Sequence, residues 1–233
     1  MAIMRRLAKH RWIVALALGV SALLPITLWA EPMPCPDAGF RVEAETAATR
    51  ALLCEAAVAA REQLGICGLR QSRPIDLVTA PTLEHEIGRC LASYDCTLER
   101  IRIIEPDLLR ANLLPDDPYA GLPDDVIFRS LLTHELAHAL VEQHTSGRKI
   151  ALVDHEYIAN ALELMALPPE HRATLLNAAG LTPPVSAGVI DILIYGLAPR
   201  RFAAAAYLYL EEHGCETVRA ILDGSASFDR GEP

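Results

Sequence analysis

Apolar positions recur at helical spacing along most of the chain and alternate as in strands over a shorter stretch. Residues 41–64 are rich in alanine, carry apolar side chains at intervals of three and four, and are followed by Gly65. This pattern predicts a helix that ends at the glycine. The segments expected to form a small antiparallel sheet after this helix are residues 74–80, 86–93 and 97–104.

The second half of the chain has the pattern of successive helices. A proline-rich loop over residues 106–125 ends in Asp124 and Asp125, which favour the start of a helix. The helices expected after it cover residues 125–143, 154–167, 169–179, 186–197, 199–212 and 215–222. The whole pattern predicts a mostly helical α+β protein with a single domain over residues 31–233.

The first 30 residues have the pattern of an export signal. Four basic residues lie within the first eleven, and an apolar run from Trp12 to Ala30 follows them. The run is also long enough to remain as an uncleaved anchor. We therefore expect residues 1–30 to be a signal peptide or an N-terminal membrane anchor. The domain that follows is then periplasmic or secreted, or is held at the inner membrane.

The cysteines agree with export. All six cysteines follow the leader. An even number of cysteines in an exported chain predicts up to three disulfide bonds, and we expect them within the single domain. The pairs we expect are Cys90 with Cys96 across a turn, Cys54 with Cys67, and Cys35 with Cys215.

Composition narrows the classes of partner. Apolar residues make up 52% of the 233 residues, which is ample for a buried core, and the formal net charge is −9. The leader holds four basic residues and no acidic one, so the rest of the chain is more acidic still. This charge does not favour nucleic acid or anionic lipid as a partner, and we expect membrane contact only through an uncleaved N-terminal segment. The oligomeric state stays open.

A metal-binding motif lies in the helix expected over residues 125–143. His134 and His138 are four residues apart, so they lie on one face of a helix and can bind one Zn²⁺ through nitrogen. Glu135 lies beside the metal rather than on it, where it can take a proton from zinc-activated water. The alternative is an ordinary helix whose histidines pack in the core, although burying them without a ligand is costly.

The third metal ligand has three candidates. Glu156 lies on the next expected helix, and Asn160 follows it by one turn, where it could hold a ligand histidine through the second ring nitrogen. His144 has the metzincin spacing, but that pattern needs glycine where Val141 stands. Asp154 is the third candidate. Glu156 is favoured, because a helix, a turn and a second helix can bring it back to the two histidines.

These residues resemble the gluzincin branch of the zincin metallopeptidases. The resemblance rests on His-Glu-Leu-Ala-His at 134–138 and on Glu156-x-x-Ala159-Asn160, and it covers about residues 98–167. It is closest to small bacterial envelope members of that group. It implies a zincin-like domain in which residues 97–104 form the edge strand that pairs with an extended peptide.

The resemblance also implies roles for individual residues. His134, His138 and Glu156 would bind one zinc ion per chain, and Glu135 would be the general base and then the proton donor to the leaving amine. The oxyanion would need a donor from the C-terminal part. The available side chains are Tyr157, Tyr195 and His213, and the sequence does not choose among them.

The leading functional expectation is therefore a zinc-dependent metallopeptidase that acts on a peptide or protein. One alternative is a zinc-binding but inactive zincin-like protein with a role in binding or assembly at the envelope. Hydrolysis of an amide other than a peptide bond is also compatible with zinc-activated water. The last alternative is a secreted structural protein in which the motif is accidental, and zinc content separates that alternative from the others.

Overall fold

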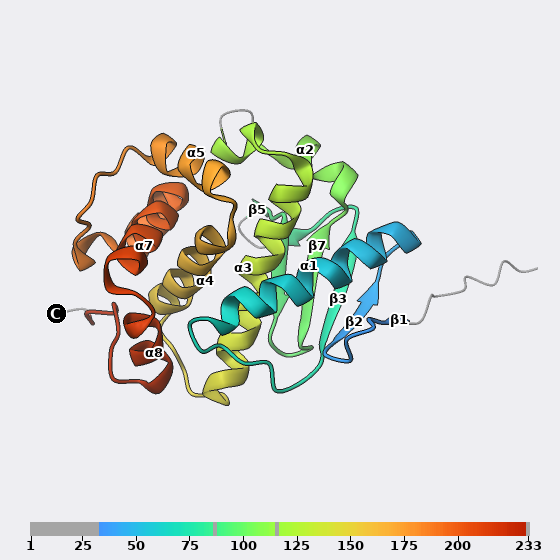
Figure 1. Ribbon diagram of the computed structural model, residues 1–233, viewed down its shortest axis with the longest axis horizontal. Coiled ribbons are helices and arrows are strands. Elements are labelled where there is room, and N and C mark those ends of the chain that lie inside the picture. Colours follow the sequence, from blue (N-terminus) through green and yellow to red (C-terminus); the bar gives the residue numbers. More distant parts are fainter. Residues whose placement is uncertain (1–32, 86–87, 115–116, 232–233) are drawn as a thin grey trace, which may run out of the picture. The chain divides into compact units, whose positions relative to one another are not determined.

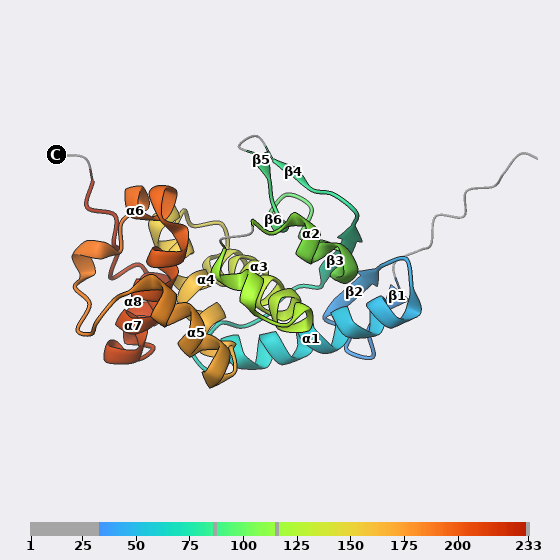
Figure 2. The same ribbon diagram turned by 90° about the horizontal axis from the view of Figure 1, so that it is seen from above.

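The computed structural model describes residues 33–85, 88–114 and 117–231 (Figures 1 and 2). The expected export signal lies outside these residues. In the part of the chain that is described, no helix is both long and apolar enough to cross a membrane. The strands are β1 (Met33–Pro34), β2 (Phe40–Glu43), β3 (Ile75–Ala80), β4 (Glu84–His85), β5 (Gly88–Arg89), β6 (Ala92–Asp95) and β7 (Arg100–Ile104).

The α+β, mostly helical class expected from the sequence is confirmed. The α-helices are α1 (Ala47–Gly65), α2 (Leu109–Asn112), α3 (Asp124–Thr145), α4 (Leu152–Ala166), α5 (Pro169–Ala179), α6 (Ile192–Leu197), α7 (Pro199–His213) and α8 (Glu216–Asp223). Short 3-10 helices cover Pro106–Leu108, Pro118–Gly121 and Ala187–Val189.

The main sheet is mixed, so the expectation of a purely antiparallel sheet is wrong. Its strand order is β1-β2-β3-β7-β6, with β2, β3 and β7 parallel and the two outer strands antiparallel to their neighbours. Two parallel pairs cause this: β3 with β7, and β3 with β2, a four-residue strand in a segment whose pattern indicated only helix. Since α1 lies between β2 and β3, the chain crosses over a face of the sheet, and such crossovers join parallel strands.

The start of α1 explains why that strand was missed. Thr46 is the N-cap, and its hydroxyl oxygen accepts a hydrogen bond from the Thr49 N–H at 3.0 Å. The helix therefore begins at Ala47 rather than at residue 41, and the residues before Thr46 are free to pair as β2.

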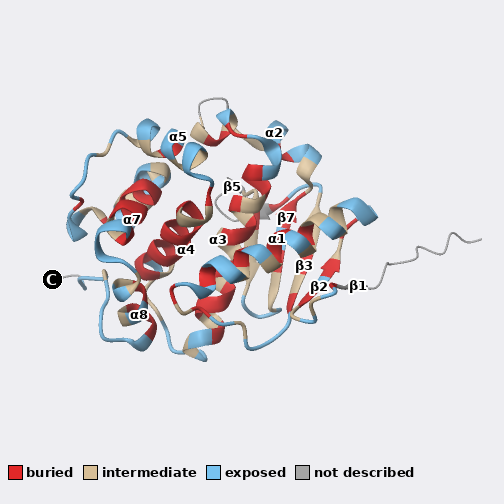
Figure 3. Ribbon diagram, viewed as in Figure 1, coloured by how far each residue is buried: buried red, intermediate tan, exposed pale blue. Residues whose placement is uncertain are grey.

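Helices cover one face of the sheet. Phe40, Leu77 and Ile101 are fully buried, and α1 and α3 pack against the sheet as neighbouring elements (Figures 1 and 3). The opposite face is polar, with an ion pair between Arg41 and Asp76 on adjacent strands. Since the helices cover only one face of this sheet, the apolar and polar residues alternate along β2 and β3.

The edge strand differs from the one expected. Residues 97–104 were expected at the edge, but β7 lies inside the sheet between β3 and β6. β6 is the outer strand on this side, and α3 contacts it. The short β6 follows the β4–β5 hairpin. The chain then turns back and forms β7, which pairs with β6 in antiparallel register.

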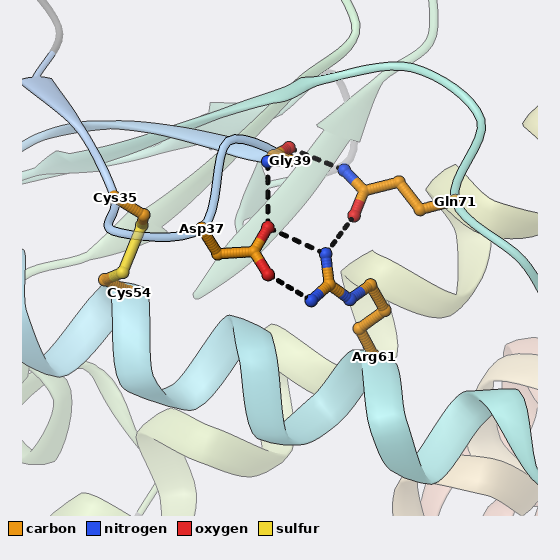
Figure 4. The surroundings of a disulfide bond; sticks show 6 residues. All are labelled: Cys35, Asp37, Gly39, Cys54, Arg61 and Gln71. Atoms are coloured by element: carbon orange, nitrogen blue, oxygen red, sulfur yellow. Dashed lines mark hydrogen bonds and ion pairs between the residues drawn. A yellow bond between two sulfur atoms is a disulfide. The ribbon is translucent and has the colours of Figure 1, made fainter.

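The cysteine pairs differ from all three that were expected. Cys35 is bonded to Cys54 (Figure 4) and Cys67 to Cys215, whereas Cys90 and Cys96 are free thiols. Two disulfide bonds point to an oxidising, exported environment.

The geometry of the intervening elements explains these corrections. Cys54 and Cys67 are separated by helix α1, which at 1.5 Å per residue holds their Cα atoms about 20 Å apart. Cys90 and Cys96 flank the extended strand β6, which separates them by roughly 15–20 Å. A disulfide bond needs Cα atoms within about 7 Å, so neither pair can form in this fold.

An ion pair fixes the loop after β1 to the C-terminal part of α1 (Figure 4). The Arg61 guanidinium donates to both carboxylate oxygens of Asp37, and the Gly39 N–H donates to the same carboxylate at 2.8 Å. The hydrogen bond from Arg61, with the one from Gly39, lowers the pKa of Asp37 to about 2. Gln71 closes the network by donating to the Gly39 carbonyl oxygen at 2.6 Å.

This ion pair predicts a pH-dependent contribution to stability. The folded pKa of Asp37 is lowered, so its ionised carboxylate adds to the free energy of unfolding. This contribution is complete above about pH 4 and is lost as the pH falls toward 2. We expect Asp37→Asn to lower the melting temperature at pH 7 by about 2–4 °C. The difference from the wild type should shrink between pH 4 and pH 2. Thermal unfolding followed by circular dichroism measures this, with the exposed Asp107→Asn as control, and a difference that stays constant over that range would contradict the assignment.

Candidate metal centre

Two neighbouring helices bring the candidate site together. α3 carries His134, Glu135 and His138, and α4 carries Glu156; the two helices pack along each other (Figure 1). α3 ends at Ser146, which adopts a left-handed conformation with φ 52°. This cap ends the helix and lets the chain turn back into α4.

The C-terminal end of α3 is also fixed to the sheet. The buried Gln143 side chain accepts hydrogen bonds from the backbone N–H groups of Ser72 and Arg73 at 2.8 and 3.1 Å, and donates to Glu99 at 2.9 Å. These bonds hold the helix against the segments that precede β3 and β7. The face of α3 that carries the histidines therefore has a fixed position relative to β6.

Three side chains converge on one point. The Nε2 atoms of His134 and His138 are 3.1 Å apart, and the carboxylate oxygens of Glu156 lie 3.7 Å from each of them. All three potential ligand atoms lie within 4.8 Å of one another. Burial and the nearby His134 lower the pKa of His138, so its ring stays neutral with a lone pair free for a cation. The group could hold a metal ion.

Asn160 has a different partner from the one expected. Its amide donates to the Glu156 carboxylate at 3.3 Å and to the Glu156 carbonyl oxygen at 2.8 Å, and it bonds to neither His134 nor His138. It thus orients the carboxylate rather than an imidazole. Burial raises the pKa of Glu156, while His134 and hydrogen bonds from Tyr195 and Asn160 oppose that shift.

Glu163 holds the histidine instead, and the sequence reasoning missed it. Its carboxylate lies 3.0 Å from Nδ1 of His134, on the side of the ring away from the candidate metal position. The Tyr119 hydroxyl donates to the same carboxylate at 2.5 Å and the Ser130 hydroxyl at 2.6 Å. Burial alone would raise the pKa of Glu163, but the His134 hydrogen bond outweighs burial and lowers it.

A signal for Glu163 was present in the sequence. Glu163 follows Glu156 by seven residues, which is two helical turns, so both carboxylates lie on the face of α4 that meets α3. Glu163 in turn acts on the imidazole. Burial alone would lower the pKa of His134, but the hydrogen bond and charge of Glu163 raise it to about 9.

The other two candidates for the third ligand lie elsewhere. His144 is exposed in the last turn of α3 and is not part of the convergent group. Asp154 is buried, but it accepts hydrogen bonds from the Ser227 hydroxyl at 2.6 Å and the Phe228 N–H at 2.7 Å. Asp154 therefore fixes the C-terminal segment to the start of α4.

Glu135 lines the same cavity as the convergent group. Burial, with a contribution from the charge of Glu156, raises its pKa to about 7, although His134 opposes the shift. A cation held by the group would favour the ionised form of Glu135. Its side chain is not one of the three converging ligands, so it remains available to exchange a proton.

The cavities beside the group extend to both sides of it. One, of about 590 Å³, is lined by β6 residues, by the three converging side chains and by His155, whose ring centroid lies 5.7 Å from that of His138. A second, of about 610 Å³, lies on the other side. His134 and Glu135 line both cavities, which places the group at their junction.

The three side chains available as oxyanion donors lie in different surroundings. Tyr195 lines both cavities and lies close enough to Glu156 for its hydroxyl to lower the pKa of that carboxylate. Tyr157 is buried and lines neither cavity. His213 is exposed at the end of α7, where its ring stacks on Tyr209.

Comparison with known proteins gives a family. The family model described as a family of unknown function, DUF6639, matches residues 40–231. The chain belongs to DUF6639. No curated protein and no solved structure matches it. The matched residues include α3, α4 and all described residues around the candidate centre.

The geometry ranks the candidate ligands of this DUF6639 protein. We expect Glu156→Ala to abolish retention of one metal ion per chain, whereas His144→Ala should retain it, because only Glu156 faces both ring nitrogens. Elemental analysis of dialysed protein measures the metal content. The reverse ranking would favour the metzincin-like ligand set.

A second variant pair tests the role of Glu163 in the DUF6639 site. Glu163→Gln removes the negative charge beside His134 Nδ1 and leaves one acceptor oxygen for three donors, so we expect a 10- to 100-fold loss of metal affinity, the range typical for groups that orient a ligand. Ser130→Ala removes a donor to the same carboxylate but leaves its contact with His134, so its effect should be much smaller. Competition with a chelator gives both affinities, and equal losses would show that Glu163 acts only through general packing.

Proposed function

We propose that this chain is a zinc-dependent metallopeptidase. The observation that carries the proposal is the convergence of His134, His138 and Glu156 where two cavities adjoin. Two imidazole nitrogens and one carboxylate are the donor set of catalytic zinc sites, which keep a fourth position open.

The separations between the ligand atoms fit zinc. At a Zn–N bond length of 2.0–2.1 Å and tetrahedral angles, two ligand nitrogens lie about 3.3 Å apart. The observed separations are 3.1 Å between the histidines and 3.7 Å from each histidine to Glu156. A zinc ion bound here would polarise a carbonyl group and lower the pKa of water.

Glu135 is the residue we assign to proton transfer. It adjoins His134 on α3, lines both cavities and does not belong to the ligand set. A carboxylate in this position can accept a proton from the attacking water and deliver it to the leaving amine. Tyr195 lies across the junction, where its hydroxyl can donate to the oxyanion.

The shape of the site favours an extended polymer as substrate. The two cavities together exceed the volume that one amino-acid side chain needs, and Ala92 of β6 lines both. β6 is an edge strand, so its outer backbone groups can pair with an added strand. A peptide bound in this way would cross the metal position with its scissile bond near Glu135.

The disulfide bonds support action outside the cytoplasm. They agree with an export signal in the first 30 residues, so we place the protein in the periplasm or the secreted fraction, or at the inner membrane if the leader is retained. Its substrate would then be an exported peptide or protein.

The decisive variant is Glu135→Gln. We expect it to keep one zinc ion per chain and to lower the hydrolysis of fluorescently labelled, unfolded casein by a factor of about 10²–10⁴, the usual contribution of a general base. Glu170→Gln, on the exposed side of α5, is the matched control and should behave as the wild type. Zinc content and fluorescence release are both measured.

Each outcome of this comparison has a distinct meaning. Hydrolysis by Glu135→Gln at the wild-type rate would show that Glu135 is not the general base. Zinc binding without hydrolysis by the wild type would favour a zincin-like binding or assembly protein. If the wild-type protein holds no zinc after reloading, the motif at 134–138 is not a zinc site and its histidines only pack in the helix interface.

A further inference from the structure

We propose that Arg200 is a positioning residue of the candidate metal centre. It lies in the first turn of α7 and is not among the converging ligands. It acts on His134 through the ring of Tyr119 and the carboxylate of Glu163. The inference rests on metal binding at the centre, which the proposed function also requires, and it is independent of peptide hydrolysis.

The helix that carries Arg200 does not explain its position. The positive end of a helix dipole lies at the N-terminus, so a cation in the first turn is disfavoured there. Arg200 is nevertheless turned inward, with only 34% of its side chain exposed, whereas the neighbouring Arg201 is exposed. Contacts with other segments therefore hold Arg200 in place.

These contacts come from the 3-10 helix at Pro118–Gly121 and its first neighbour. The central carbon of the Arg200 guanidinium lies 3.8 Å from the centroid of the Tyr119 ring, and one guanidinium nitrogen donates to the Asp117 carboxylate at 3.0 Å. The other oxygen of Asp117 accepts a hydrogen bond from the Tyr119 N–H at 2.9 Å. Asp117 thus binds both members of the stacked pair, so the three groups hold one another in place.

Tyr119 connects this cluster to the metal centre. Its side chain is buried, and its hydroxyl donates at 2.5 Å to one oxygen of Glu163, whose other oxygen lies 3.0 Å from Nδ1 of His134. Burial and the charge of Glu163 raise the pKa of Tyr119, although Arg200 opposes the shift, so the hydroxyl keeps its proton and remains a donor. A cation over the face of an aromatic ring draws electron density from the ring and strengthens that donor.

The consequence for the imidazole follows from the two ends of the carboxylate. Tyr119 and Ser130 bond one oxygen of Glu163, which leaves the other oxygen directed at His134. Without Arg200 the ring loses its stacking partner, and the carboxylate gains freedom to turn away from Nδ1. The imidazole then presents its second nitrogen less precisely to a metal ion, as happens when groups that orient a ligand are removed.

The test is a double-mutant cycle on zinc affinity. Arg200→Met removes the charge and keeps most of the stem, and we expect it to weaken zinc binding by the full chain about 3- to 10-fold, less than loss of the orienting carboxylate itself. In a Tyr119→Phe background the same substitution should cost less than about twofold, because the hydroxyl through which Arg200 acts is absent. Chelator competition gives the dissociation constants, at a temperature at which circular dichroism shows every variant folded.

Two further variants sharpen the comparison. Arg201→Met changes the same residue type in the same turn of α7, where the exposed Arg201 donates to the Ala179 carbonyl oxygen at 3.1 Å, and it should leave zinc affinity unchanged. Arg200→Lys keeps a cation near the ring but loses the flat stack, so its affinity should lie between those of the wild type and Arg200→Met. No loss in Arg200→Met, or equal losses with and without the Tyr119 hydroxyl, would overturn the inference.

The readouts separate this inference from the proposed function. Coupling between Arg200 and Tyr119 in zinc affinity, without casein hydrolysis by the wild type, would keep the role of Arg200 and reject the peptidase. Casein hydrolysis with zinc affinities that show no coupling would keep the peptidase and reject the role of Arg200. A wild-type chain that binds no zinc would overturn both.

Discussion

The contact between Glu163 and His134 is the interaction on which the candidate centre depends. It places a carboxylate in the interface of α3 and α4, where an unpaired charge would destabilise the packing. Tyr119 and Ser130 complete its hydrogen bonding from two further positions in the chain. The orientation of one imidazole is thereby linked to the packing of both helices, so a change in the candidate centre also affects the core.

Much of the helical half could be predicted because its signals are local. α5 begins and ends at the predicted residues, since Pro169 favours the first turn and Gly180 adopts the left-handed cap. The two histidines and Glu156 meet as the spacing predicted. Each of these predictions needs only the period of a helix and the chemistry of its ends.

The features that the sequence did not reveal depend on contacts between distant segments. β2 has four residues and becomes a strand by pairing with β1 and with β3, and β3 lies more than thirty residues later. Glu163 was missed because its partner lies on another helix. The cysteine pairs were wrong because spacing along the chain was considered before the rigid length of α1, although that length already excludes Cys54 with Cys67.

The bond between Cys67 and Cys215 encloses a covalent ring of chain. Its ends are 148 positions apart, and α3, α4 and β6 all lie within it. A protease that cuts a surface loop inside this ring leaves the two pieces joined as one molecule, with every converging ligand still attached. A chain with this bond can thus be nicked without shedding a fragment, and its nicked form separates only after reduction.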